Sequence, residues 1–183
     1  IYKGDNNNAF DCLKLLHKEY PSVNSAREIS NHYLDLDEKD NADETIQTFL
    51  ESDKTYSELY KGIRHVKANR DIQAEKAYKK VLKKDKNNVD ALRLLGLLAT
   101  KNRKYSVAEK LFIKAISLQP YYKLLWDNLA KCYRFQNKLT EAKKAFSNLI
   151  KLDPSNFEAI GASATMSVRL GQYNEGIALY KDL

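Results

Sequence analysis

Small and aromatic residues recur along this chain at a spacing of 34 residues, and no other feature constrains the fold as strongly. Glycine or alanine occupies two such series, and an aromatic residue occupies a third. The first series is Gly62, Gly96 and Ala130, the second is Ala74, Ala108 and Ala142, and the third is Tyr78, Phe112 and Phe146. A fixed period of this length is typical of an array in which one small structural unit is repeated.

The composition indicates that each unit is helical. The 183 residues include only 6 glycines and 3 prolines, whereas a β-rich protein with many turns would need more of both. Leucine, alanine and lysine are abundant, and all three favour helices. We therefore expect helices joined by polar turns.

The clearest copy of the repeat spans residues 123–156 and contains the single tryptophan of the chain. Its spaced positions are Trp126, Leu129, Ala130, Tyr133, Ala142, Phe146 and Pro154. This spacing resembles the tetratricopeptide repeat family, whose pattern has glycine where this copy has Ala130. The resemblance implies an all-α fold: a right-handed α-solenoid of antiparallel helix pairs, with about five repeats including partial ones.

The resemblance also gives the repeated positions a packing role. Small residues stand where two helices cross closely, because a larger side chain would hold the backbones apart. Aromatic residues fill the space between successive pairs. Pro154 marks a helix end, since proline cannot continue a helix. We therefore expect the residues that define the repeat, Trp126 included, to build the core and not a site.

We expect residues 1–183 to form one solenoid domain whose repeats differ in regularity. The copies lie near 1–22 (partial), 23–54, 55–88, 89–122, 123–156 and 157–183 (partial). Residues 9–21 fit a lone second helix of a pair, and the 23–54 copy is about two residues short. The spaced positions of the 23–54 copy are Ala26, Ile29, Ser30, Tyr33, Ala42, Ile46 and Phe49. The chain thus begins and stops inside a repeat, and no polar cap follows the last one. Because a solenoid end needs such a cap, we expect a segment of a longer protein.

The sequence shows no pattern for catalysis or metal binding. His17, His32 and His65 fall in different repeats, and no cysteine or carboxylate stands at metal-ligand spacing around His65. Cys12 and Cys132 are about three repeats apart, so they cannot form a disulfide in an array where only neighbouring repeats touch. We expect both to be reduced and half-buried. Phosphate-binding glycine loops and nucleophile motifs are missing, so we expect neither an enzyme nor a cofactor.

Charge is distributed unevenly along the chain, whose net charge is +7. Residues 1–54 carry a net charge of −6, residues 55–122 of +10 and residues 123–183 of +3. The densest basic run is residues 76–86, which could face nucleic acid or an anionic membrane surface. We interpret it as a solvated lysine face of a second helix, because aromatic residues placed to stack on bases are missing from it. Nucleic-acid binding is the less favoured hypothesis.

In the tetratricopeptide repeat family, one face of the first helix of each pair lines the inner groove of the array. The resemblance places the candidate partner-binding residues on that face: Tyr60, Lys67, Arg93, Lys101, Asn128, Lys131, Arg134, Phe135 and Arg169. Apolar and aromatic residues, among them Leu97, Leu124 and Val168, alternate with arginine and lysine on this face. This lining suits an extended or helical protein segment that carries apolar and acidic side chains.

The best-known groove chemistry of the family is a clamp for the C-terminal carboxylate of chaperones. The positions that match the clamp hold Arg93, Leu97, Asn128, Glu158 and Ala162. Only Arg93 and Asn128 are compatible with it, and Glu158 would repel a carboxylate. A role as a chaperone co-factor is therefore disfavoured.

The favoured hypothesis is a non-catalytic scaffold that binds a protein or peptide in its groove. The alternative is the N-terminal recruiting module of a larger enzyme, such as a sulfotransferase or glycosyltransferase with these repeats. Residues 91–120 look like the repeats that precede sulfotransferase domains in some bacterial proteins. The sequence contains neither an apolar run near the roughly 18 residues that span a bilayer nor the apolar segment of a signal peptide. We expect no membrane span and a cytoplasmic location.

Overall fold

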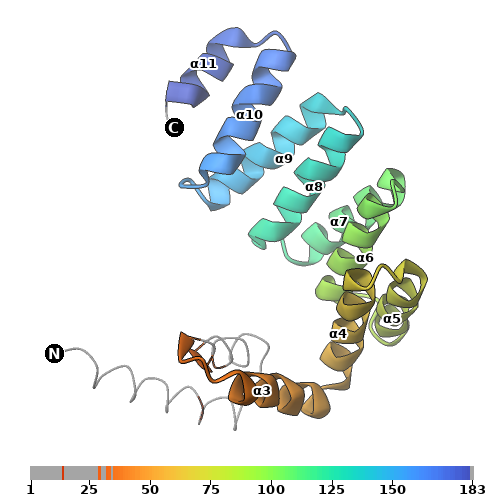
Figure 1. Cartoon of the computed structure of the whole chain (residues 1–183). Helices are drawn as coiled ribbons and strands as arrows, with labels where there is room; N and C mark the ends of the chain where they lie inside the picture. The colour runs from red at the N-terminus through yellow and green to blue at the C-terminus, as the bar shows by residue number, and fades with distance from the viewer. Residues whose placement is uncertain (1–13, 15–28, 30–31, 34, 182–183) are drawn as a thin grey trace, which may run out of the picture. The chain divides into compact units, whose positions relative to one another are not determined.

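The computed structural model describes residues 14, 29, 32–33 and 35–181 (Figure 1). Over these residues it contains helices and no strand. The helices are α3 (Lys39–Ser52), α4 (Lys54–Lys67), α5 (Asp71–Lys84), α6 (Val89–Lys101), α7 (Tyr105–Leu118), α8 (Lys123–Phe135), α9 (Leu139–Leu152), α10 (Phe157–Arg169) and α11 (Tyr173–Lys181). The predicted helix at 9–21, apart from Lys14, and the predicted thiol Cys12 lie outside the described residues.

The chain divides into two compact units, Ile1–Lys61 and Gly62–Leu183. In the first unit, α3 buries Ala42 and Phe49, two of the residues predicted for the 23–54 copy. The Phe49 ring lies 5.4 Å from the ring of Tyr56, between centroids. Ile29, another predicted position of this copy, is also buried.

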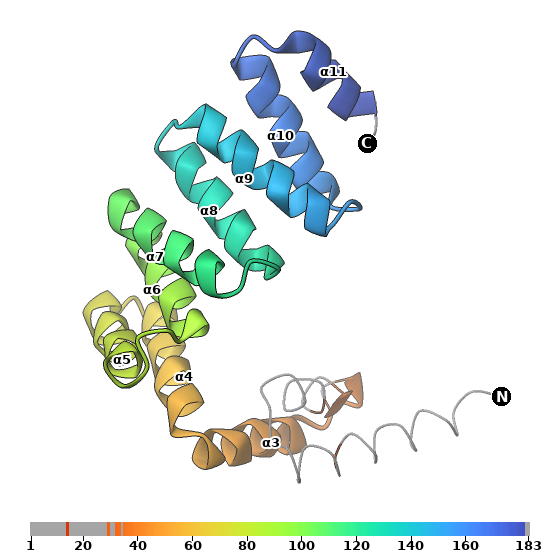
Figure 2. The same ribbon diagram turned by 180° about the vertical axis from the view of Figure 1, so that it is seen from behind.

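The second unit is a stack of helix pairs. Helix α6 packs on α7, α8 on α9, and α10 on α11, while α7 contacts α8 and α9 contacts α10 (Figures 1 and 2). Each pair falls inside one of the frames 89–122, 123–156 and 157–183. The prediction of an all-α solenoid built from helix pairs is confirmed. We call the first helix of each pair the A helix and the second the B helix.

The turn inside each pair has the same backbone geometry in every repeat. Asn69, Arg103, Asn137 and Gly171 stand 34 residues apart, and each has a positive φ, between 55° and 76°. This left-handed conformation is easy for glycine and tolerable for asparagine, but uncommon for arginine. One residue in this conformation reverses the chain so that the B helix runs back along its A helix.

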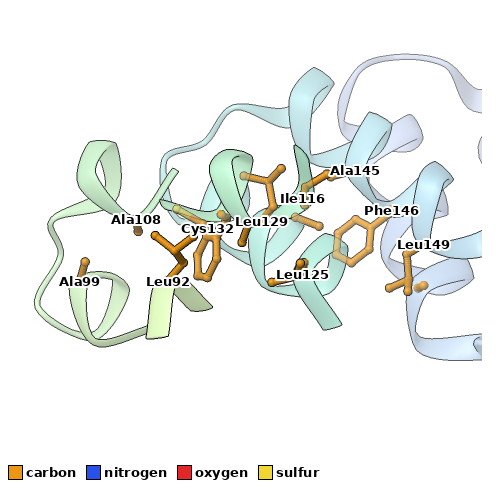
Figure 3. Close-up of a cluster of buried hydrophobic side chains, with 14 residues drawn as sticks. Leu92, Ala99, Ala108, Ile116, Leu125, Leu129, Cys132, Ala145, Phe146 and Leu149 are labelled. Atoms are coloured by element: carbon orange, nitrogen blue, oxygen red, sulfur yellow. The ribbon is translucent and has the colours of Figure 1, made fainter. Parts of the chain in front are cut away.

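The core of the second unit runs through successive pairs without interruption. Phe112 of α7, Leu125 and Leu129 of α8, and Phe146 of α9 belong to one buried cluster (Figure 3). The predicted small positions are closed to solvent as well: Ala74, Ala108 and Ala142 are each 0% exposed. The packing role predicted for the repeated positions is therefore confirmed for these residues.

Gly96 shows why a small residue is needed at its position. A Cβ added there would lie 2.6 Å from Cε1 of Phe112, much closer than carbon atoms pack. The same relation joins Gly62 to Tyr78 in the preceding pair. The aromatic residue of the B helix thus lies directly over the small residue of its own A helix. Phe112 also joins its pair to the next one, because it belongs to the same buried cluster as Leu125 and Leu129 of α8.

Two sequence expectations need correction. Cys132 is completely buried and not half-buried, because the start of α7 covers its sulfur: Sγ lies 3.6 Å from the carbonyl oxygen of Tyr105. Pro154 is exposed and contributes no core packing; it follows the last turn of α9. Trp126, by contrast, packs against the buried core cluster as expected, although it is only half-buried. Its indole Nε1 donates to the carbonyl oxygen of Pro120 at 2.8 Å. The tryptophan therefore anchors the loop between two pairs.

We predict that Phe112→Ala destabilises the protein by about 3–5 kcal/mol, because it leaves a cavity next to Gly96 that rigid helices cannot close. The neighbouring residue Ile113 is 47% exposed, so Ile113→Ala is the matched control and should cost less than about 1 kcal/mol. Urea unfolding of the full chain, followed by circular dichroism, measures both values. Equal losses for the two variants would contradict the central role of Phe112.

Candidate functional site

The candidate surface is the exposed face of the three A helices α6, α8 and α10, which we call the A-helix face. Residues three, four and seven apart share one side of a helix, and the predicted groove positions follow this spacing. The helices meet along this face: Lys131 of α8 lies 2.9 Å from the Asp127 carboxylate on its own helix and 3.3 Å from the Glu158 carboxylate of α10.

Apolar side chains are exposed on this face. Leu97 of α6, Leu124 of α8 and Val168 of α10 are 37%, 49% and 38% exposed. They occupy predicted groove positions, where nothing within the described part of the chain covers them fully. Exposed apolar side chains on one face of a repeat array mark a surface that can bury them against a partner.

In three repeats, the last groove position makes a contact to the preceding repeat. Lys101 Nζ lies 2.7 Å from Oδ1 of Asp71. Phe135 stacks on Tyr105, with ring centroids 6.0 Å apart and an interplanar angle of 11°. In the last repeat, Arg169 donates to Oδ1 of Asn137 at 2.9 Å. We call Lys101, Phe135 and Arg169 the bracing residues, because each joins an A helix to the turn or B helix of the pair before it.

Sequence reasoning gave the bracing residues a ligand role and missed these contacts. The sequence contains a pattern that indicates two of these contacts. Lys101 and Asp71 have opposite charges and are 30 residues apart, and Phe135 and Tyr105 are both aromatic and have the same separation. Arg169 does not follow that spacing, since its partner Asn137 precedes it by 32 residues.

Lys131 also has its charge compensated inside the protein. Desolvation lowers the pKa of its ammonium, but the hydrogen bonds and charges of Asp127 and Glu158 together raise it above the ordinary value. An incoming carboxylate would have to compete with two carboxylates already present. Lys131 is therefore a weak candidate for binding an acidic partner.

Two arginines of the predicted site differ in availability. Arg134 is exposed, and no hydrogen bond or ion pair involves it among the described residues. Arg93 is largely buried: its Nε lies 3.9 Å from Oδ1 of Asp90 and has no hydrogen-bond acceptor. Of these two cations, Arg134 is the one that presents an uncompensated charge on the A-helix face.

Three predicted site residues remain: Asn128, Lys67 and Tyr60. Asn128 is half-buried on α8, and its side chain makes no hydrogen bond within the described part. Lys67 is exposed near the end of α4. Tyr60 is 40% exposed and belongs to the first unit.

No group of three or more histidine, cysteine or acidic residues that could hold a metal ion occurs among the described residues. Burial raises the pKa of the Cys132 thiol above its ordinary value, so the sulfur is held in its neutral form. None of the helices in the described part is both long enough and apolar enough to cross a bilayer.

A second link between repeats involves Glu109 of α7. Its Oε2 accepts hydrogen bonds from Lys138 Nζ at 2.8 Å and from Gln136 Nε2 at 3.2 Å, both from the turn between α8 and α9. Desolvation raises the pKa of Glu109, but these hydrogen bonds and the Lys138 charge outweigh it, so the net pKa is lowered. The ionised carboxylate is thus part of the contact between neighbouring pairs.

Two sequence models of one family match the chain, both described as tetratricopeptide repeat. One matches residues 61–123 and the other residues 124–156. Together they cover more than half of the 183 residues. No curated protein matches the chain at a significant level.

Solved structures with a similar fold include the following three proteins. MamA aligns with a TM-score of 0.66 at 18% identity, over 84% of this chain and 91% of that one. PilF of Pseudomonas aeruginosa aligns with a TM-score of 0.68 at 18% identity, over 87% and 73%. The first tetratricopeptide repeat domain of Spaghetti (RPAP3), bound to the HSP90 peptide SRMEEVD, aligns with a TM-score of 0.60 at 25% identity, over 64% and 96%.

We predict that Phe135→Ala lowers the free energy of unfolding by about 0.5–1.5 kcal/mol, because it removes the stack on Tyr105. Leu124→Ala on the same helix should change it by less than about 0.5 kcal/mol, since Leu124 is 49% exposed. Urea unfolding at pH 7 measures both. A stability loss confined to Leu124→Ala would show that Phe135 does not brace the repeats.

We also predict that the effect of Glu109→Gln depends on pH. The folded-state pKa of Glu109 lies below its ordinary value, so the contact stabilises the fold above the unfolded pKa and is lost as the pH falls through the folded one. The variant should therefore have a lower urea midpoint than wild type at pH 7, and the gap should close on acidification. Glu141→Gln, at an exposed carboxylate of α9, is the control. A gap that stays constant with pH would contradict the role of the ionised carboxylate.

Proposed function

Because the chain belongs to the tetratricopeptide repeat family, we propose that it is a protein-interaction scaffold that binds a peptide segment of a partner protein on its A-helix face. The repeat is a binding architecture whose stacked helices present one continuous surface. The proposal assigns no catalytic step to this chain.

The exposed apolar residues carry the proposal. Leu97, Leu124 and Val168 are partly uncovered on three successive A helices, and covering them with a ligand would contribute about 25 cal/mol for each Å² of apolar surface buried. Arg134 adds an uncompensated positive charge. It stands one repeat before Val168, at the equivalent position of its helix.

The charges of this face favour a partner that is mainly apolar with few acidic groups. Three cations of this face already have acceptors within the protein: Lys101, Lys131 and Arg169. A strongly acidic segment would have to displace those acceptors before it could bind the cations. A carboxylate placed beside Arg134 would meet no such competition. We therefore propose an extended or helical segment with apolar side chains and one or two acidic residues.

The similar structure of Spaghetti was solved with a peptide that contains two glutamates and an aspartate. This supports a peptide ligand for the present chain but not the same sequence preference. At the positions that correspond to the family's carboxylate clamp, Leu97 and Ala162 lack polar groups and Glu158 is 77% exposed at its side chain. We propose that recognition here does not use a C-terminal carboxylate clamp.

Selection from a displayed peptide library with the full chain as bait, followed by titration of the selected peptides, tests the proposal. We predict that Arg134→Glu weakens those peptides that contain an acidic residue by at least about tenfold, because an exposed charge pair becomes a repulsion. Lys110→Glu makes the same charge change on the exposed surface of α7 and should have little effect. Thermal unfolding checks that both variants fold.

Two outcomes would overturn the proposal. One is a library selection that yields no peptide with saturable binding. The other is that Lys110→Glu weakens the selected peptides as much as Arg134→Glu does, because binding would then respond to overall charge and not to the A-helix face.

A further inference from the structure

One stripe of α9 carries polar and cationic side chains that neither the core nor the A-helix face uses. The residues of this stripe are Thr140, Lys144, Ser147, Asn148 and Lys151. Their spacing of four, seven, eight and eleven residues from the first puts them on one side of the helix. Together with Lys143 and the turn between α10 and α11, they line a cavity of about 540 Å³.

The walls of this cavity are rich in hydrogen-bond donors. Threonine and serine hydroxyls, the asparagine amide and the lysine ammonium groups all donate. Leu170 is the one aliphatic residue among those that line it. These donors can bind a ligand that carries many acceptor oxygens.

The lysines of the cavity are not equivalent. Lys143 donates to Oε1 of Gln172 at 2.7 Å and forms an ion pair with Glu175, so its position is fixed and its charge compensated. Lys144 and Lys151 are exposed, and neither has a hydrogen bond or an ion pair among the described residues. The cavity therefore holds two ammonium groups without a counter-charge.

The spacing of these two lysines limits the ligand. Seven residues correspond to roughly 10 Å along a helix, with Ser147 and Asn148 between the two cations. Lysine side chains are long and flexible, so both ammonium groups can reach one ligand placed over the middle of the stripe. A single small monoanion would satisfy only one of them.

The preceding repeat lacks this combination. The positions equivalent to Lys143 and Ser147 hold Glu109 and Ile113 on α7, 34 residues earlier. Glu109 brings a negative charge that pairs with Lys138, and Ile113 is apolar and exposed. The α9 combination is therefore absent from α7, whereas α5 carries lysines at both equivalent positions, Lys76 and Lys83.

We propose that the cavity between α9 and the α10–α11 turn binds a small soluble anion with at least two negatively charged phosphate groups, held by Lys144 and Lys151. Phosphate oxygens accept charge-assisted hydrogen bonds from ammonium groups and ordinary ones from the hydroxyls and the amide between them. Because the two lysines are exposed, binding weakens as salt concentration rises. The site lies on a B helix and is separate from the A-helix face.

The test uses the full chain and inorganic pyrophosphate, titrated by isothermal calorimetry at low ionic strength. We expect saturable one-site binding that is at least about tenfold weaker in the double variant Lys144→Gln/Lys151→Gln, since the variant loses both charge-assisted hydrogen bonds. The matched control is Lys83→Gln/Lys110→Gln. It removes two exposed lysines from the equivalent positions of α5 and α7 and should change the affinity by less than about twofold.

The outcomes separate a site from a general effect of charge. Equal weakening by both double variants, or binding that does not saturate, would overturn the proposal, because positive charge alone would then explain the signal. All four substituted lysines are exposed, so both variants should keep the wild-type unfolding temperature. Loss of pyrophosphate binding with unchanged peptide binding would leave the proposed function of the A-helix face intact.

Discussion

The contact of an aromatic ring on the B helix with a small residue on the A helix sets the geometry on which the second unit depends. Phe112 lies so close to Gly96 that no Cβ fits between them, and this fixes how closely the two helices approach. The same ring belongs to the cluster that includes Leu125 and Leu129 of the following pair. One side chain therefore sets the spacing within a pair and the stacking between pairs.

This contact explains why the 34-residue period predicts the fold so well. Every pair must solve the same packing problem, so the positions of Gly96 and Phe112 are filled by a small residue and an aromatic one in each regular copy. The left-handed turn residue adds a second constraint, one that the sequence shows less clearly. Arginine at 103 adopts the same positive φ as the asparagines at 69 and 137, because the packing of the two helices overrides the local preference.

The candidate site could be predicted only in part. Periodicity places Lys101 and Arg134 at neighbouring positions of the same face on successive A helices, and the sequence alone does not distinguish the two cations. In the structure, Lys101 reaches the Asp71 carboxylate of the preceding repeat, while Arg134 has no acceptor among the described residues. Which cation is compensated depends on how the turn of one repeat meets the A helix of the next. A helical spacing rule does not contain that information.

Surface charge has a different meaning in a stacked array than in a globular domain. Lys76, Lys110 and Lys144 hold the same position on three successive B helices. One A helix lies between two successive B helices, and neighbouring helix axes are about 8–10 Å apart. Equivalent lysines on successive B helices are therefore roughly 16–20 Å apart, which exceeds the Debye length of about 8 Å at physiological salt. Their mutual repulsion is therefore largely screened, and the array can carry many lysines at little cost in stability.

It follows that a row of lysines alone does not indicate a ligand-binding site. Lys144 differs from Lys110 because it lines a cavity with a second uncompensated lysine and neutral donors between them, and that arrangement, not the number of charges, makes the α9 stripe a candidate anion site.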